Sequence, residues 1–178
     1  MHPMHTATSV LTAVGGVSDT GALKRAGVTR RDLESRVLDG SVLRVTRGVY
    51  ALPDADPMVV HAARHHAVPG CVTAALAAGL WVVRVPDMPH LAARHGKHIP
   101  GCVVHRSAIP LSPLDVVCQS LRCLPPLEGL TIAESAVKAG LVQLPALRER
   151  FPAVREKAIL GLVAKIRPQS GSIIETMA

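Results

Sequence analysis

The chain has 178 residues, of which 48% are hydrophobic and 2% aromatic, and its formal net charge is +7. So large an apolar fraction excludes an intrinsically disordered chain. No apolar run reaches the roughly 18–20 residues of a membrane span, and the N-terminus lacks the features of a secretory signal. We therefore expect a cytoplasmic protein without a membrane partner, whose positive charge favours a polyanion such as nucleic acid.

The first 28 residues predict two short helices. Residues 6–14 form the first, which ends at a pair of glycines, and residues 20–26 form the second, with Ser18 or Asp19 as its N-cap. Leu23 and Ala26 are expected to face inward. Gly27 then suits a tight turn, because glycine readily adopts the left-handed conformation at a helix C-terminus.

The third predicted helix spans residues 30–38. Thr29 is expected to be its N-cap, and Asp32 occupies the third helical position, as in a capping box. The spacing of the apolar residues predicts that Leu33, Val37 and Leu38 are buried.

The periodicity then changes to that of strands. Residues 41–45 and 48–52 are short β-type runs joined by a turn at residues 46–48. Two helices, a turn, a third helix and a two-stranded wing predict a winged helix-turn-helix over residues 4–53. The prolines at positions 53 and 57 place the domain boundary after residue 56.

Residues 57–178 are predicted to form a second, mixed α/β and mostly helical domain, so the fold class of the chain is α+β. We expect its strands at residues 81–85, 90–93 and 101–106. Its predicted helices span residues 58–68, 71–78, 112–121, 127–139, 145–151 and 153–166, with Ser112 as an N-cap and Pro113 at a first helical position.

A helix-turn-helix presents the N-terminal side chains of its second helix to base edges in the major groove. The residues expected at bases are Thr29, Arg30, Arg31 and Ser35, and those expected at phosphates are Lys24 and Arg36. The wing adds Arg44, Thr46 and Arg47, placed for the backbone or the minor groove. The alternative is that these arginines only form a solvated helix face.

The charge distribution adds a second expectation. Residues 1–56 carry seven Lys/Arg and six Asp/Glu, whereas residues 57–178 carry thirteen and seven. The second domain is therefore expected to extend the DNA footprint, either by its own contacts or by positioning two copies of the chain. The sequence leaves a monomer and a homodimer both open.

Two stretches of the N-terminal region resemble a known family. They run from Val17 to Leu33, with the segment Ala26-Gly27-Val28-Thr29-Arg30-Arg31-Asp32-Leu33, and from Gly40 to Pro53, with Arg47-Gly48-Val49-Tyr50. They resemble the N-terminal domain of AbiEi-type antitoxins of type IV toxin–antitoxin systems. The resemblance implies a winged helix that binds operator DNA and represses its own promoter, a cognate toxin as a further partner, and a packing role for Tyr50.

The resemblance continues more weakly through the second half. Residues 61–81, 103–106, 112–117 and 133–142 look like the middle region of actinobacterial AbiEi-like proteins. The tail at residues 169–176 resembles the opening of a nuclease domain similar to very-short-patch-repair endonucleases, with Glu175 as its first acidic residue. Metal-dependent cleavage needs several carboxylates, and the sequence ends three positions later. We therefore expect a truncated, catalytically inactive relative rather than an enzyme.

No cofactor or metal site is predicted. His61 and His65 have a spacing that could ligate a metal on one helix face, with completing ligands among His66, His95, His98, His105 and Cys102. However, there is no H-E-x-x-H motif, and the four cysteines at positions 71, 102, 118 and 123 include no C-x-x-C pair. Ordinary histidines and buried free thiols are the expectation.

These inferences lead to one functional hypothesis and its rival. We expect a sequence-specific repressor that binds double-stranded DNA, either an antitoxin-like autoregulator or a phage immunity repressor. The alternative is a protein-interaction module, a toxin-neutralising antitoxin or decoy, that uses the winged helix as a scaffold.

Overall fold

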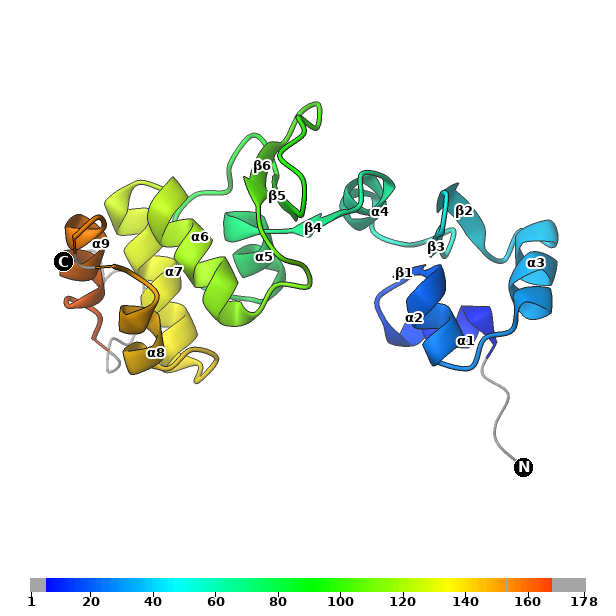
Figure 1. Cartoon of the computed structure of the whole chain (residues 1–178), viewed down its shortest axis with the longest axis horizontal. Helices are drawn as coiled ribbons and strands as arrows, with labels where there is room; N and C mark the ends of the chain where they lie inside the picture. The colour runs from blue at the N-terminus through cyan, green and yellow to red at the C-terminus, as the bar shows by residue number, and fades with distance from the viewer. Residues whose placement is uncertain (1–5, 153, 168–178) are drawn as a thin grey trace. The chain divides into compact units, whose positions relative to one another are not determined.

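The computed structural model describes residues 6–152 and 154–167 and contains helices and two small three-stranded sheets, an α+β composition. The chain divides into two compact units, residues 1–67 and 68–178 (Figure 1). This division lies beyond the boundary predicted after residue 56. Helix α4 (Pro57–Arg64) accounts for the difference, because it packs against the strands of the first unit.

The first unit combines four helices with one antiparallel sheet of strand order β1-β3-β2. The first three helices pack their apolar faces around Leu11, Leu23, Leu33 and Val42, which are all buried. The elements are α1 (Ala7–Ala13), β1 (Val17–Asp19), α2 (Thr20–Arg25), α3 (Arg30–Leu38), β2 (Leu43–Thr46), β3 (Val49–Ala51) and α4.

Capping side chains fix where the helices of the first unit begin. Asp19 accepts a hydrogen bond from the N–H of Ala22 at the start of α2, and Thr29 accepts one from the N–H of Asp32 at the start of α3. The expected capping box of α3 is wrong in one respect. The Asp32 carboxylate does not return to Thr29 but accepts the N–H of Ala7, at 2.6 Å, and so ties α1 to α3.

Two further features of the first unit differ from expectation. Leu38, predicted to be buried, is 91% exposed at the last position of α3, whereas Val37 beside it packs against the core. Strand β1 was not predicted. It pairs with β3 (Val17 opposite Ala51), but three residues are too few to show an alternating pattern.

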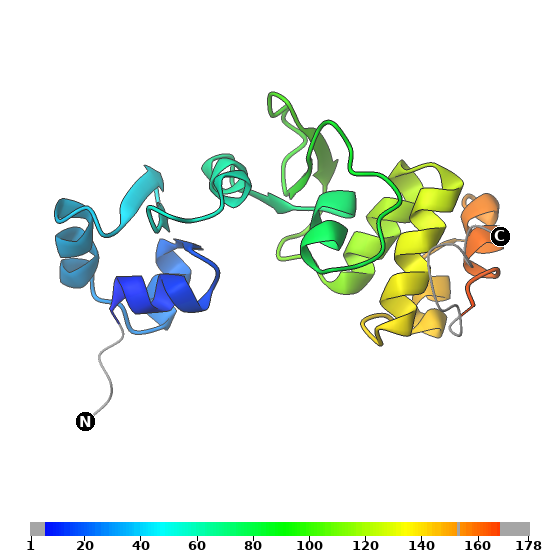
Figure 2. The same cartoon turned by 180° about the vertical axis from the view of Figure 1, so that it is seen from behind.

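The second unit has a sheet of order β4-β5-β6 beside a group of helices (Figure 2). Strands β5 and β6 run parallel, with His90 opposite Val103. The elements are β4 (Ala67–Pro69), α5 (Cys71–Ala77), β5 (His90–Ala93), β6 (Val103–Arg106), α6 (Pro113–Cys123), α7 (Pro126–Lys138), α8 (Leu144–Glu149) and α9 (Lys157–Val163).

Helices α6 and α7 form the centre of this unit, and a glycine lets them approach closely. A Cβ at Gly129 would lie 3.0 Å from the carbonyl oxygen of Ser120 and 3.1 Å from the Cα of Leu121. The core around this contact includes Val117, Ile132 and Leu147, all nearly inaccessible to solvent.

The predictions for the second unit are partly corrected. Residues 81–85 are not a strand, because the N–H of Trp81 donates to the side chain of Ser135 at 3.0 Å instead of to a neighbouring strand. Strand β4 was not predicted, and α9 is shorter than the helix expected at residues 153–166. The tail at residues 169–176, including Glu175, lies outside the described residues.

Candidate nucleic-acid interface

Helix α3 presents polar side chains along its N-terminal half. Thr29, Arg30, Arg31 and Ser35 are all exposed, as the sequence predicts, while Leu33 anchors the opposite face in the core. No acidic group among the described residues lies within ion-pair distance of Arg31. Its guanidinium is thus available to an external acceptor.

The other two arginines of α3 are engaged within the helix. The Arg30 Nε donates to a Glu34 carboxylate oxygen at 2.7 Å, and this hydrogen bond and charge raise the pKa of Arg30. Arg36 is only partly exposed and lies 3.6 Å from carboxylate oxygens of both Asp32 and Asp39. Arg36 is consequently less free to meet a phosphate than we expected.

The β2–β3 hairpin carries the remaining basic residues of the predicted wing. Arg44 and Arg47 are exposed and have no acidic partner within the described part of the chain, whereas Thr46 is half-buried. A bulge lies between Arg44 and Thr46, and Gly48 has φ of +77°. The Gly48 carbonyl accepts the N–H of Thr20 at 2.9 Å, so the turn is held against the start of α2.

The acidic residues of the first unit are mostly used by the backbone. Four of the five aspartates at positions 1–67 accept backbone N–H groups: Asp19 from Ala22, Asp32 from Ala7, Asp39 from Ser41 and Asp56 from Met58. Glu34 is paired with Arg30. A nearly balanced charge count therefore leaves Arg31, Arg44 and Arg47 without neutralising partners.

Lys24, the last predicted phosphate contact, is exposed in the final turn of α2. Tyr50 is half-buried and packs against the core of the first unit, which agrees with a packing role. Arg25, the neighbour of Lys24, is also exposed but was not among the predicted contacts.

The basic surplus of the second unit is partly neutralised internally. Arg84 pairs with Glu128, Arg122 with Glu156 and Arg150 with Asp115. Arg106, Arg122 and Arg150 line a shared pocket of about 340 Å³, in which Arg106 has no acidic partner among the residues described.

The two histidines of the predicted pair are adjacent in the structure. His61 and His65 meet edge to face with ring centroids 5.2 Å apart. Within residues 6–152 and 154–167, no third metal-ligating side chain joins them. His66, His95, His98 and Cys102 likewise belong to no ligand group in this part of the chain.

Comparison with family models and with curated proteins does not test the resemblance to AbiEi-type antitoxins, which stays a prediction. No family model matches the chain, and no curated protein matches it. Across the described residues, the helices are too short or too polar to traverse a lipid bilayer.

Proposed function

We propose that the first unit is a winged helix-turn-helix and that the protein is a sequence-specific, DNA-binding transcriptional repressor in the cytoplasm. The observation that carries this proposal is the set of three exposed arginines, Arg31, Arg44 and Arg47, on α3 and the β2–β3 hairpin. All three lack acidic partners in the described chain, although residues 1–56 contain six acids against seven bases. An unneutralised arginine is suited to guanine acceptors or phosphate oxygens.

In this proposal α3 lies in the major groove and the hairpin contacts the adjacent backbone. Arg31, in the first turn of α3, reads a base, because residues at the start of a recognition helix reach the base edges. Arg44 and Arg47 meet phosphates, which fix the orientation of the protein without reading sequence.

The test is binding of the whole chain to DNA from upstream of its own gene, measured by fluorescence anisotropy at several salt concentrations. Log affinity should fall with log salt with a slope of about −0.9 per phosphate contact. Arg44→Ala and Arg47→Ala should each make that slope shallower by about 0.9 and weaken all DNA sequences alike. Arg64→Ala, an exposed arginine on α4, is the matched control and should change neither quantity.

Arg31 is tested separately because its proposed role is to read a base. Arg31→Ala should cost about 1–3 kcal/mol on the preferred sequence and much less on unrelated DNA. Arg31→Lys keeps the charge but loses the two-pronged geometry, so it should behave like alanine on the preferred sequence. Equal binding by wild type, Arg31→Ala and the double variant Arg44→Ala/Arg47→Ala would refute the interface.

A second candidate function rests on Leu38. This side chain is 91% exposed at the end of α3, and Leu43 on β2 is 47% exposed. Exposed apolar side chains of this kind can serve protein contacts. If the unit neutralises a toxin instead of binding DNA, Leu38→Ser should abolish association with that partner while leaving DNA affinity unchanged.

We also propose a relationship to AbiEi-type antitoxins or to phage repressors of similar architecture. The neighbourhood of the gene tests the setting. A nucleotidyltransferase-like toxin gene next to it would support the antitoxin, while integrase and early lytic genes would support the phage repressor.

A further inference from the structure

Four metal-ligating side chains converge in the second unit. The ligand atoms of Cys71, His90, His105 and Cys123 all lie within 4.8 Å of one another. The imidazole nitrogens His90 Nδ1 and His105 Nε2 are 3.1 Å apart, and Cys123 Sγ is 3.7 Å from His90 Nδ1. Each residue belongs to a different element, and these elements (α5, β5, β6 and α6) lie together in Figures 1 and 2.

The separations of His90 from His105 and from Cys123 are close to those around one tetrahedral ion. With Zn–N bonds of about 2.0–2.1 Å and Zn–S bonds of about 2.3 Å, tetrahedral angles place two nitrogen ligands about 3.4 Å apart and a nitrogen and a sulfur about 3.6 Å apart. The observed separations of 3.1 and 3.7 Å differ from these values by a few tenths of an ångström. Two imidazoles and two thiolates in a tetrahedron are a ligand set typical of zinc.

Burial disfavours the charged forms of His90, His105 and Cys71. Burial lowers the pKa of both histidines, and the charge of His90 lowers that of His105 further. Neutral imidazoles are the form that binds metal. Burial also raises the pKa of the Cys71 thiol to about 12. A bound cation would reverse that effect, since a coordinating thiol is deprotonated by the metal.

Hydrogen bonds from the backbone of Cys71 and His90 fix two of the four ligands in position. Cys71 has φ of +46°, an unfavourable conformation for a non-glycine residue and one that tends to occur at functional sites. Its N–H donates to Gln119 Oε1 at 2.9 Å, and the N–H of His90 donates to Thr73 Oγ1 at 2.7 Å. These bonds connect α5 to α6 and β5 to α5.

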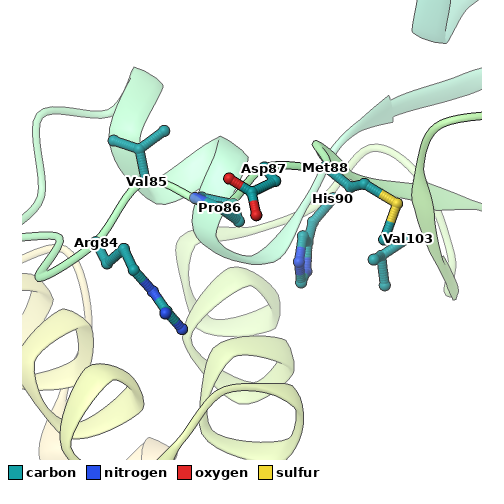
Figure 3. A pocket seen from close by; sticks show the side chains of 7 residues that line it. All are labelled: Arg84, Val85, Pro86, Asp87, Met88, His90 and Val103. Atoms are coloured by element: carbon teal, nitrogen blue, oxygen red, sulfur yellow. The ribbon is translucent and has the colours of Figure 1, made fainter.

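The group is also accessible from outside. His90 lines a pocket of about 290 Å³ together with Asp87, Met88 and Val103. In Figure 3 its imidazole lies on the pocket wall between Asp87 and Val103. Cys123 itself is exposed. A metal ion from solution can therefore approach the group at Cys123 and at His90, whereas Cys71 is fully buried.

We propose that Cys71, His90, His105 and Cys123 form a structural Zn²⁺ site. Four protein ligands fill the tetrahedron and leave no position for water, as in closed structural sites. The ion joins two helices and two strands that are far apart in sequence. This zinc proposal does not depend on whether the first unit binds DNA.

The first experiment measures the metal content of the full chain, purified without a histidine tag and dialysed against metal-free buffer. We expect one equivalent of zinc per chain. Removing a group that hydrogen-bonds to a metal ligand lowers metal affinity about 10–100-fold, so removing a ligand itself should lower zinc affinity at least about 100-fold. Cys123→Ser and His105→Ala should show this loss. Cys102→Ser and His98→Ala are the matched controls and should retain the full equivalent.

A second experiment uses only wild-type protein, so that it does not depend on the folding of variants. Zinc is removed with a chelator under reducing conditions, and Co²⁺ is titrated in. We expect the intense visible absorption of tetrahedral cobalt, a thiolate charge-transfer band, and loss of both when zinc is added. Zinc should also raise the unfolding temperature followed by the fluorescence of Trp81, which lies in this unit.

Three results would overturn the proposal. The first is the absence of stoichiometric metal and of tetrahedral cobalt spectra. The second is a Cys71–Cys123 disulfide found by mass spectrometry of the native protein, with the two histidines simply hydrogen-bonded. The third is undiminished zinc in the double variant Cys71→Ser/Cys123→Ser.

Discussion

Among the polar side chains of the first unit, we expect that of Asp32 to contribute most to the free energy of unfolding. Replacing it with alanine removes the acceptor of the Ala7 N–H, which lies 2.6 Å away, and the ion pair of Arg36, at 3.6 Å. The side chain is 23% exposed, so solvent replaces these interactions only in part.

The expected loss can be estimated from these contacts. A hydrogen bond to a charged group contributes about 1.5–3 kcal/mol, and a partly exposed ion pair adds about 0–1 kcal/mol. The better helix propensity of alanine returns up to about 0.7 kcal/mol. We therefore expect Asp32→Ala to lower the free energy of unfolding of the first unit by about 2 kcal/mol.

Urea denaturation followed by two probes measures this. Circular dichroism reports both units, whereas the only tryptophan, Trp81, reports the second unit alone. A loss of 2 kcal/mol corresponds to a midpoint shift of about 1–2 M urea, since the urea dependence of a small unit is about 1–2 kcal/mol/M. The shift should appear by circular dichroism, and the tryptophan midpoint should not move.

Asp54→Ala is the matched control, because Asp54 is exposed and makes no ion pair within the described chain. It changes the net charge equally and should lower the free energy of unfolding by less than about 0.5 kcal/mol. If both variants lost the same free energy of unfolding, the bond between Asp32 and the N–H of Ala7 would not stabilise the first unit, which would refute this prediction.

Three further predictions concern caps, pH and charge. Ser112→Ala removes both hydrogen bonds that join the Ser112 hydroxyl to Asp115 at the start of α6, and should cost about 1 kcal/mol by tryptophan fluorescence; no change would refute the capping box. Burial raises the pKa of Asp115, but the hydrogen bonds from Ser112 and Arg150 outweigh burial and lower that pKa overall. The ionised form of Asp115 therefore stabilises the fold at pH values above the unfolded pKa of about 3.9, and this stability is lost as the pH falls through the lower folded pKa. The stability difference between wild type and Arg150→Met should therefore be constant above about pH 5 and shrink below about pH 4; a difference independent of pH would contradict it. Glu34→Gln releases Arg30 and should steepen the salt dependence of DNA binding by about 0.9 if Arg30 then meets a phosphate, whereas an unchanged slope would place Arg30 away from the backbone.

Local signals in the sequence were sufficient for the elements that local chemistry determines. Thr29 and Ser112 mark the starts of α3 and α6, because each hydroxyl accepts the N–H three residues later. The strand at His90–Ala93 was predicted with its observed bounds. The exposure of Arg31, Arg44 and Arg47 also agrees with the prediction, although their contact with DNA stays a proposal.

Features that depend on distant partners were not predictable in this way. The Trp81–Val85 run has the composition of a strand, but the side chain of Ser135 on α7 takes its first N–H. Leu38 follows the apolar spacing of α3 but lies beyond the core that would cover it. Neither Ser135 nor the limit of the core is visible in the local pattern.

The four-ligand group shows the same limit most clearly. His105 was considered as a ligand, but in combination with histidines that the structure does not bring to it. Its nearest partner in sequence, His90, is fifteen positions away, and Cys123 is thirty-three positions from His90. Motif searches look for ligand pairs separated by two to five residues, so a site assembled from four separate elements has no such signature.

The way the first unit uses its acids has a consequence for how the protein can evolve. Four of the five aspartates in that unit accept backbone N–H groups, whereas Arg31, Arg44 and Arg47 make no ion pair within the described chain. Substitutions at these three positions should therefore leave stability nearly untouched. If these arginines bind DNA as proposed, substitutions there can change the target without a compensating gain in stability elsewhere, so recognition and folding can change separately.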